Sequence, residues 1–101
     1  MVNKIDEKEF NEKISVNKKV IVDCYADWCG PCRMLAPIIE DVSNELIDFD
    51  FYKLNVDEAS NVSRKYGIMS IPTILVFKNG ELSKQLVGFC DHDKLIKEIC
   101  D

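Results

Sequence analysis

The chain has 101 residues, of which 47% are hydrophobic, and a formal net charge of -5 at pH 7. This size predicts one domain over residues 1–101, with enough apolar side chains for a core without disulfide staples. The acidic balance argues against nucleic acids and anionic membrane surfaces as partners. No run is long enough to span a bilayer, and the first residues lack the apolar stretch of a signal peptide, so we expect a cytoplasmic location.

Hydrophobic periodicity and turn signals predict strands alternating with helices. In chain order the predicted elements are a strand at 2–5, a short helix capped by Asp6, a strand at 20–26, a long helix at 31–47, a strand at 49–56, a short helix at 57–66, strands at 71–77 and 82–87, and a last helix capped by Asp91. The apolar, β-branched run at 20–26 is typical of a strand covered on both faces. The order implies an α/β fold with a central mixed β-sheet flanked by helices on both faces.

Three local signals mark particular positions in these elements. Asp6 followed by Glu9 matches a capping box, which begins a helix. The pair Asn79-Gly80 between the last two strands is a signal of a tight hairpin. Pro37 lies inside the long helix, where it removes a backbone hydrogen bond and predicts a kink.

The stretch Trp28-Cys29-Gly30-Pro31-Cys32 lies between the apolar strand and the long helix. Two thiols at this spacing either close a disulfide across one turn or supply half of a metal site. Zinc needs four ligands, and the remaining candidates, Cys90 and His92, lack a second pair with ligand spacing. A strand before the pair and a helix after it favour redox chemistry, and we expect no metal.

Cys29 is predicted to lie on an exposed turn at the N-terminus of the long helix. Gly30 gives the turn conformational freedom, and Pro31 suits the first helical turn because its missing N–H costs nothing there. Unpaired N–H groups and the helix dipole favour a thiolate at this point, and the thiolate is the reactive form of cysteine.

With these motifs the chain resembles the thioredoxin family over essentially its whole length. A bare pair of cysteines at this spacing is weak evidence, but the combination of motifs at these separations is specific. The matching stretches are Val22-Asp23, Ala26-Asp27-Trp28-Cys29-Gly30-Pro31-Cys32, Pro37, Lys53-Leu54-Asn55-Val56-Asp57, Tyr66-Gly67-Ile68, Ile71-Pro72-Thr73, Phe77-Lys78-Asn79-Gly80 and Val87-Gly88.

The resemblance implies a thioredoxin fold and a protein-disulfide reductase. Cys29 would attack a target disulfide and form a mixed disulfide. Cys32 would resolve it, which leaves the redox-active disulfide Cys29–Cys32 for a thioredoxin reductase to reduce. The resemblance further implies no bound cofactor, disulfide-containing target proteins as partners, and a monomer.

Family resemblance also assigns roles around the cysteines. Asp23 matches a buried aspartate that helps to move the proton of the inner cysteine, and Lys53 matches a lysine near it. From the residues alone, Asp23 faces either water from an edge strand or the interior, and its apolar neighbours favour the interior. Lys53 alone would be an ordinary exposed residue. The residues that map to a flat apolar patch for the target backbone are Trp28, Ile71, Pro72, Gly88 and Phe89.

Two further expectations follow from the resemblance and not from the residues alone. The statistics of X–Pro bonds favour a trans bond before Pro72, whereas the family places a cis proline opposite the cysteines. Cys24 and Tyr25 stand where the commonest family pattern has two aromatic residues, so packing beneath the site is expected to differ.

The remaining side chains of interest lie toward the C-terminus. We expect Cys24 and Cys100 to be small buried hydrophobes. Cys90 follows the Gly-Phe of the predicted patch and is a candidate regulatory thiol. His92 lies near a helix start, is expected to be solvated, and is given no role.

Two rival functions remain. A thioredoxin-fold binding subunit would carry its thiols incidentally, which the intact Cys-Gly-Pro-Cys argues against. A disulfide isomerase or oxidant would use the same thiols at a different redox poise. Pro31 in place of a histidine removes a cationic stabiliser of the thiolate, which favours the reducing direction.

Overall fold

A five-stranded mixed sheet forms the centre of the structure, a computed structural model that describes residues 1–101. The strand order is β1-β3-β2-β4-β5. β3 runs parallel to β1 and β2, whereas β4 is antiparallel to β2 and β5 to β4. The strands are β1 (Asn3–Lys4), β2 (Lys19–Tyr25), β3 (Asp50–Asn55), β4 (Thr73–Lys78) and β5 (Glu81–Val87).

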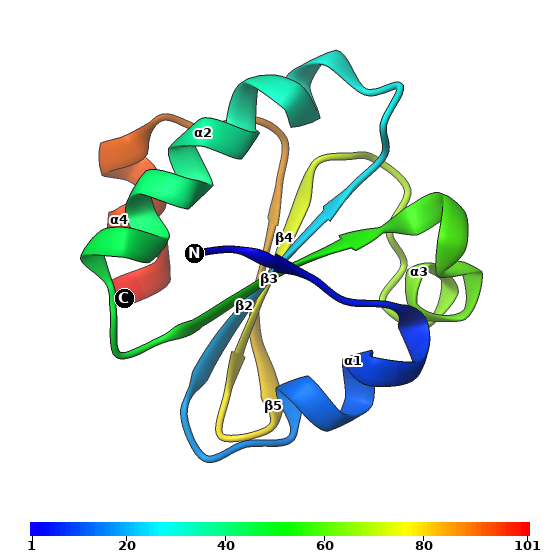
Figure 1. Ribbon diagram of the computed structural model, residues 1–101, viewed down its shortest axis with the longest axis horizontal. Helices are drawn as coiled ribbons and strands as arrows, with labels where there is room; N and C mark the ends of the chain where they lie inside the picture. The colour runs from blue at the N-terminus through cyan, green and yellow to red at the C-terminus, as the bar shows by residue number, and fades with distance from the viewer.

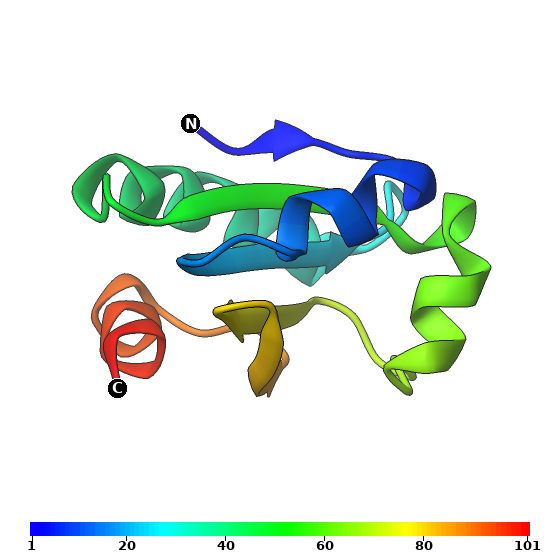
Figure 2. The same cartoon turned by 90° about the horizontal axis from the view of Figure 1, so that it is seen from below.

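Helices cover both faces of this sheet, as Figures 1 and 2 show. Helices α1 and α3 pack on one face, and α2 and α4 pack on the other. None of the helices is long and apolar enough to cross a membrane. The predicted mixed sheet between two helical layers is confirmed. The helices are α1 (Glu7–Ile14), α2 (Gly30–Glu45), α3 (Ser60–Lys65) and α4 (His92–Cys100), with a 3-10 turn at Val56–Glu58.

Strand β2 divides the core because its side chains point alternately to the two faces. Val22 and Cys24 face the core beneath α1 and α3, and Ile21 faces the core beneath α2 and α4. Asp23 therefore shares the face of Ile21 and points toward α2. The strand is buried along its centre, as its β-branched run predicts.

Two of the three local signals in the sequence are reproduced, and some element ends are shifted. Asp6 and Glu9 form the capping box of α1. Asn79 and Gly80 both have positive φ, which the tight turn between β4 and β5 requires. Helix α2 runs through Pro37 as one helix and ends at Glu45, two residues before the predicted end.

Two predicted elements differ in extent. The strand predicted from Ile71 begins only at Thr73, because the Ile71–Pro72 peptide bond is cis and proline offers no N–H to the ladder. The short helix predicted over 57–66 is divided at Ala59, whose extended φ of -143° separates the 3-10 turn from α3.

The prediction for Cys100 was wrong, and the one for Cys24 is confirmed. Cys24 is fully buried near the end of β2. Cys100 is exposed at the end of α4, because Leu95 and Ile99 occupy the buried face of that helix and Cys100 follows one position later.

The core beneath α1 gives a direct test of packing. Phe10 is buried and makes edge-to-face contacts with Tyr66 and Phe77. We expect Phe10→Ala to lower the free energy of unfolding by about 3–5 kcal/mol, because it leaves a cavity and removes both aromatic contacts.

Urea denaturation measures this loss, with Ile47→Ala as the control. Ile47 is exposed, so its truncation should change the free energy of unfolding by no more than about 0.5 kcal/mol. Equal effects of the two substitutions would contradict the assignment of Phe10 to the core.

Candidate active site

Cys29 and Cys32 form a disulfide across the first turn of α2, with their Cα atoms 5.2 Å apart. Cys29 is the N-cap of the helix, and its Sγ accepts a hydrogen bond from the backbone N–H of Cys32 at 3.2 Å. Gly30 and Pro31 form the turn between the two thiols. The sulfur of Cys29 thus takes the place that a capping oxygen usually occupies, where N–H groups and the helix dipole favour negative charge.

Both sulfur-bearing side chains are almost enclosed. Cys29 is 4% exposed and Cys32 is 3% exposed. The active-site turn is exposed at Trp28 and Pro31, as predicted. Cys29 itself is buried, because Tyr25, Val56 and Ile71 pack against the pair. The Ile71 carbonyl oxygen lies 3.8 Å from Cys29 Sγ. The side chains around the cysteine pair are therefore largely apolar.

Two predicted patch residues border Cys29 directly. Trp28 is 69% exposed, and its indole N–H donates to Asp57 Oδ2 at 2.9 Å, which fixes the ring beside the active-site turn. Ile71 packs against the cysteine pair and is followed by the cis proline Pro72.

Two further patch residues, Gly88 and Phe89, directly follow the end of β5. The Gly88 N–H donates to the Pro72 carbonyl oxygen at 2.8 Å, which joins the end of β5 to the loop before β4. Gly88 has a φ of +92°, a conformation that side chains rarely adopt. Phe89 follows it and is partly exposed.

Beneath the cysteines lies a buried carboxyl group. Asp23 is 3% exposed, and its Oδ1 has no hydrogen-bond partner. It lines a cavity of about 170 Å³ together with Cys32 and Lys53. Burial raises the pKa of Asp23 to about 7, and the positive charge of Lys53 opposes this shift. At neutral pH the carboxyl is therefore poised to take up or release a proton.

The pairing of Asp23 with Lys53 is a consequence of strand register. The two residues are direct partners between β2 and β3, and their side chains share the face beneath α2. Lys53 also lies over the ring of Tyr25, with Nζ 5.9 Å from its centroid. The structure therefore places the predicted lysine near the predicted aspartate.

Burial makes two of the other thiols, Cys24 and Cys90, less reactive. Burial raises the pKa of Cys24 to about 12, so it stays a thiol. Burial also raises the pKa of Cys90, which is half-buried against the core beneath α2 and α4. No three His, Cys, Asp or Glu side chains come together as a set of metal ligands.

Sequence reasoning missed the contacts of His92. Its ring nitrogens contact Glu45 at the end of α2 and Asp93 in the first turn of α4. Hydrogen bonds to these carboxylates raise the pKa of His92 to about 9. The side chain is partly exposed, as expected, but it links two helices, and nothing in the local sequence indicates Glu45 as its neighbour.

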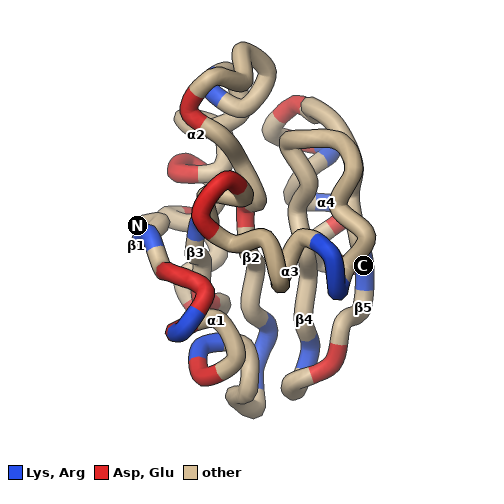
Figure 3. The backbone as a smooth tube through the Cα atoms, turned by 90° about the vertical axis from the view of Figure 1, so that its right-hand side faces the viewer, with Lys and Arg blue, Asp and Glu red and all other residues tan.

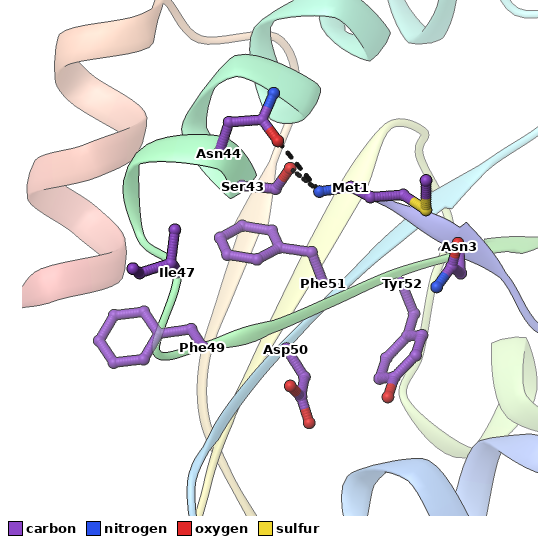
Figure 4. A pocket seen from close by; sticks show the side chains of 9 residues that line it. All are labelled: Met1, Asn3, Ser43, Asn44, Ile47, Phe49, Asp50, Phe51 and Tyr52. Carbon is purple, nitrogen blue, oxygen red and sulfur yellow. Dashed lines mark hydrogen bonds between the residues drawn. The ribbon is translucent and has the colours of Figure 1, made fainter.

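A separate cavity lies at the far end of α2 (Figure 4). It has a volume of about 290 Å³ and lies between the first residues of the chain, the end of α2 and β3. The Met1 ammonium donates there to Ser43 Oγ and Asn44 Oδ1. The cavity contains no thiol and lies at the opposite end of α2 from Cys29, so it is not part of the active site.

Comparison with known proteins identifies the family. The Thioredoxin family model matches residues 1–101. The chain belongs to the thioredoxin family. It is 44% identical over 87 residues to a thioredoxin of Mycoplasmoides gallisepticum, covering 86% of this chain and 87% of that protein. It is 49% identical over 80 residues to thioredoxin-1 of Saccharomyces cerevisiae, covering 79% and 78% of the two chains.

A solved structure supports the same conclusion for the fold. It comes from work on thiol resolution in yeast mitochondrial 1-Cys peroxiredoxin by the glutathione and thioredoxin systems. The TM-score is 0.89 at 31% identity, over 99% of this chain and 94% of that one.

Membership of the thioredoxin family also gives the activity. The protein is a thiol–disulfide oxidoreductase that acts as a protein-disulfide reductase, and the Cys29–Cys32 pair is its redox group. It needs no bound cofactor. Its family implies disulfide-containing proteins and a thioredoxin reductase as partners.

The buried carboxyl predicts an unusual dependence of stability on pH. Asp23 has a pKa of about 7 in the folded protein and about 4 when unfolded, so the native state holds more protons between these values. Stability from this group is therefore full below pH 4 and is lost as the pH rises through 7. We expect oxidised Asp23→Asn to be more stable than wild type above pH 7, by at most about 4 kcal/mol, and equal to it near pH 4.

Urea denaturation of the oxidised proteins across this pH range tests the expectation. Lys53→Met is the matched variant, because removing the lysine raises the pKa of Asp23 and moves the loss of stability to higher pH. A wild-type protein that gains stability relative to Asp23→Asn between pH 4 and 7 would contradict a desolvated carboxyl.

Proposed function

We propose that the protein reduces target disulfides with Cys29 as the attacking thiol and Cys32 as the resolving thiol. The observation that carries this assignment is the position of Cys29 Sγ at the N-terminus of α2, where it accepts the Cys32 N–H. In the reduced protein the same N–H groups stabilise a Cys29 thiolate. Cys32, one turn inside the helix, faces Asp23 and not the opening.

The reaction then has two exchange steps. The Cys29 thiolate attacks one sulfur of the target disulfide, and the other target sulfur leaves as a thiolate. The Cys32 thiolate next attacks the Cys29 sulfur of this mixed disulfide, and the second target thiolate leaves. Two electrons pass from the dithiol to the target, and the Cys29–Cys32 disulfide remains.

Asp23 serves the second step by accepting the proton of Cys32. Its pKa of about 7 matches the pH at which a general base works best. The cavity between Asp23, Cys32 and Lys53 has room for water that can carry the proton between the two groups. Lys53 stabilises the carboxylate form and so tunes the base.

The patch of Trp28, Ile71, Pro72, Gly88 and Phe89 receives the target backbone. Because β4 begins only at Thr73, the backbone of Ile71 lies outside the ladder and is available to an extended chain. Phe89 and Trp28 add exposed apolar surface to the patch.

The proposal also includes the reduction of the Cys29–Cys32 disulfide after each turnover and the place where the protein acts. A thioredoxin reductase returns the Cys29–Cys32 disulfide to the dithiol, and the protein acts as a monomeric electron carrier in the cytoplasm, where it maintains the redox balance of protein thiols. Pro31 between the cysteines supports the reducing direction, because, unlike a histidine, it supplies no cation to stabilise the Cys29 thiolate further.

Cys90 is proposed as a secondary, regulatory thiol. It directly follows Gly88-Phe89, so an adduct on its sulfur would place bulk beside the target patch. Burial raises its pKa, so it should react with oxidants more slowly than Cys29.

Removing the resolving thiol tests the order of the two steps. Reduced Cys32→Ser should attack insulin once and stop as a mixed disulfide, since no second thiol releases the target. Intact mass spectrometry and peptide mapping should place the insulin chain on Cys29. Cys29→Ser is the matched control and should form no such adduct.

Two results would reverse or remove these assignments. Adducts that accumulate on Cys32 in the Cys29→Ser protein, and not in Cys32→Ser, would exchange the two roles. Full turnover by Cys32→Ser, with thioredoxin reductase as electron donor, would show that resolution does not need Cys32.

A further inference from the structure

A groove of about 570 Å³ begins at the active-site turn and continues along α3. Trp28 and Ile71 line it. Trp28 directly precedes Cys29 in the chain, and Ile71 packs against the cysteine pair. The Ile71 carbonyl oxygen lies 3.8 Å from Cys29 Sγ. A target segment that occupies the groove therefore brings its neighbouring cysteine to the attacking sulfur.

The lining of the groove is apolar except along α3. Val56, Ile68 and Met69 supply apolar side chains, and Met69 is 96% exposed. Helix α3 contributes Ser60 and, three and four positions later, Ser63 and Arg64, which fall on one helix face. Arg64 is the one charged residue among the side chains that line the groove.

Arg64 has no partner within the protein. Its guanidinium makes no ion pair and no side-chain hydrogen bond anywhere in residues 1–101, and the residue is exposed. The neighbouring Lys65 differs, because its Nζ lies 5.5 Å from the centroid of the Tyr66 ring and it does not line the groove. Figure 3 shows this basic end of α3 and the acidic stretch just before the helix.

The acidic stretch does not neutralise Arg64. Asp57 accepts the indole N–H of Trp28 at 2.9 Å, and Glu58 pairs with Lys4 at 3.1 Å. The chain as a whole carries a net charge of -5, so most of its surface repels acidic segments. The groove that begins at the active-site turn therefore carries an unpaired positive charge, although the protein as a whole is acidic.

We propose that Arg64 selects targets that carry an aspartate or glutamate a few residues from the attacked cysteine. The guanidinium offers a planar fork of N–H donors that fits a carboxylate, while the apolar wall of Trp28 and Ile71 receives the intervening side chain. Arg64 is a specificity residue in this proposal, which rests on the proposed function of Cys29.

A pair of peptide disulfides tests the selection. Each peptide carries one cysteine joined by a disulfide to a fluorescence quencher, and the two differ only in having Glu or Gln at one position. This position is scanned from two to five residues on either side of the cysteine. At its best position we expect Glu to raise kcat/KM about two- to fivefold over Gln at low salt, the range of an exposed ion pair.

Variants assign the preference to one side chain. Arg64→Gln should remove it, and Arg64→Glu should favour a Lys peptide over the Glu peptide at the same position. Lys65→Gln removes the adjacent positive charge outside the groove and should leave the preference unchanged. Raising the salt concentration to about 1 M should abolish the preference, because screening weakens an exposed pair.

The controls separate this proposal from the function on which it rests. Equal reduction of Glu and Gln peptides by the wild type at every position overturns the role of Arg64 and leaves disulfide reduction intact. A preference that survives Arg64→Gln, or that Lys65→Gln removes, also overturns it. Failure to reduce any of the peptides overturns the proposed function, and the selection by Arg64 with it.

Discussion

The burial of an ionisable carboxyl group under the redox disulfide is the constraint on which the site depends. Asp23 lies in the central strand of the sheet, between β3 and β4, where helices cover both faces. Folding removes the Asp23 carboxyl group from water and leaves its Oδ1 without a hydrogen-bond partner. Burying an aliphatic residue at this position would cost less free energy than burying a carboxyl group. We therefore interpret the stability lost here as a requirement of the proton transfer proposed for Asp23.

The two cysteines experience different surroundings although only one helical turn separates them. Cys29 caps the helix, where backbone N–H groups and the helix dipole favour negative charge on its sulfur. Cys32 lies inside the helix and shares a cavity with Asp23 and Lys53, so its proton has a nearby acceptor. In the proposed mechanism, Cys29 therefore attacks the target, and Cys32 loses its proton after the mixed disulfide has formed.

Much of this arrangement could be predicted from the sequence. The apolar run in β2, the cap at Asp6 and the Asn79-Gly80 turn are local signals, and each produced the element expected from it. The position of Cys29 at a helix start follows in the same way from the glycine and proline beside it. These features depend on neighbours in the chain, which a sequence shows directly.

Other features depend on register and packing, which the sequence does not show. The pairing of Asp23 with Lys53 joins residues 30 positions apart through the alignment of two strands, and only family resemblance indicated it. The enclosure of Cys29 by Val56 and Ile71 has the same origin. Arg64 carries no signal at all, because an exposed arginine in a short helix is ordinary until the groove beside it is seen.

The proton transfer from Cys32 to Asp23 is the central claim, and the pH dependence of the resolving step tests it most directly. A preformed mixed disulfide on Cys29 allows release of the target thiol to be followed in a single turnover. The rate should rise with a midpoint near pH 7 in the wild type, where Asp23 becomes an acceptor. In Asp23→Asn the rise should move toward the ordinary cysteine pKa of about 8.5, with a lower rate at neutral pH. Superimposable profiles for the two proteins would contradict the claim.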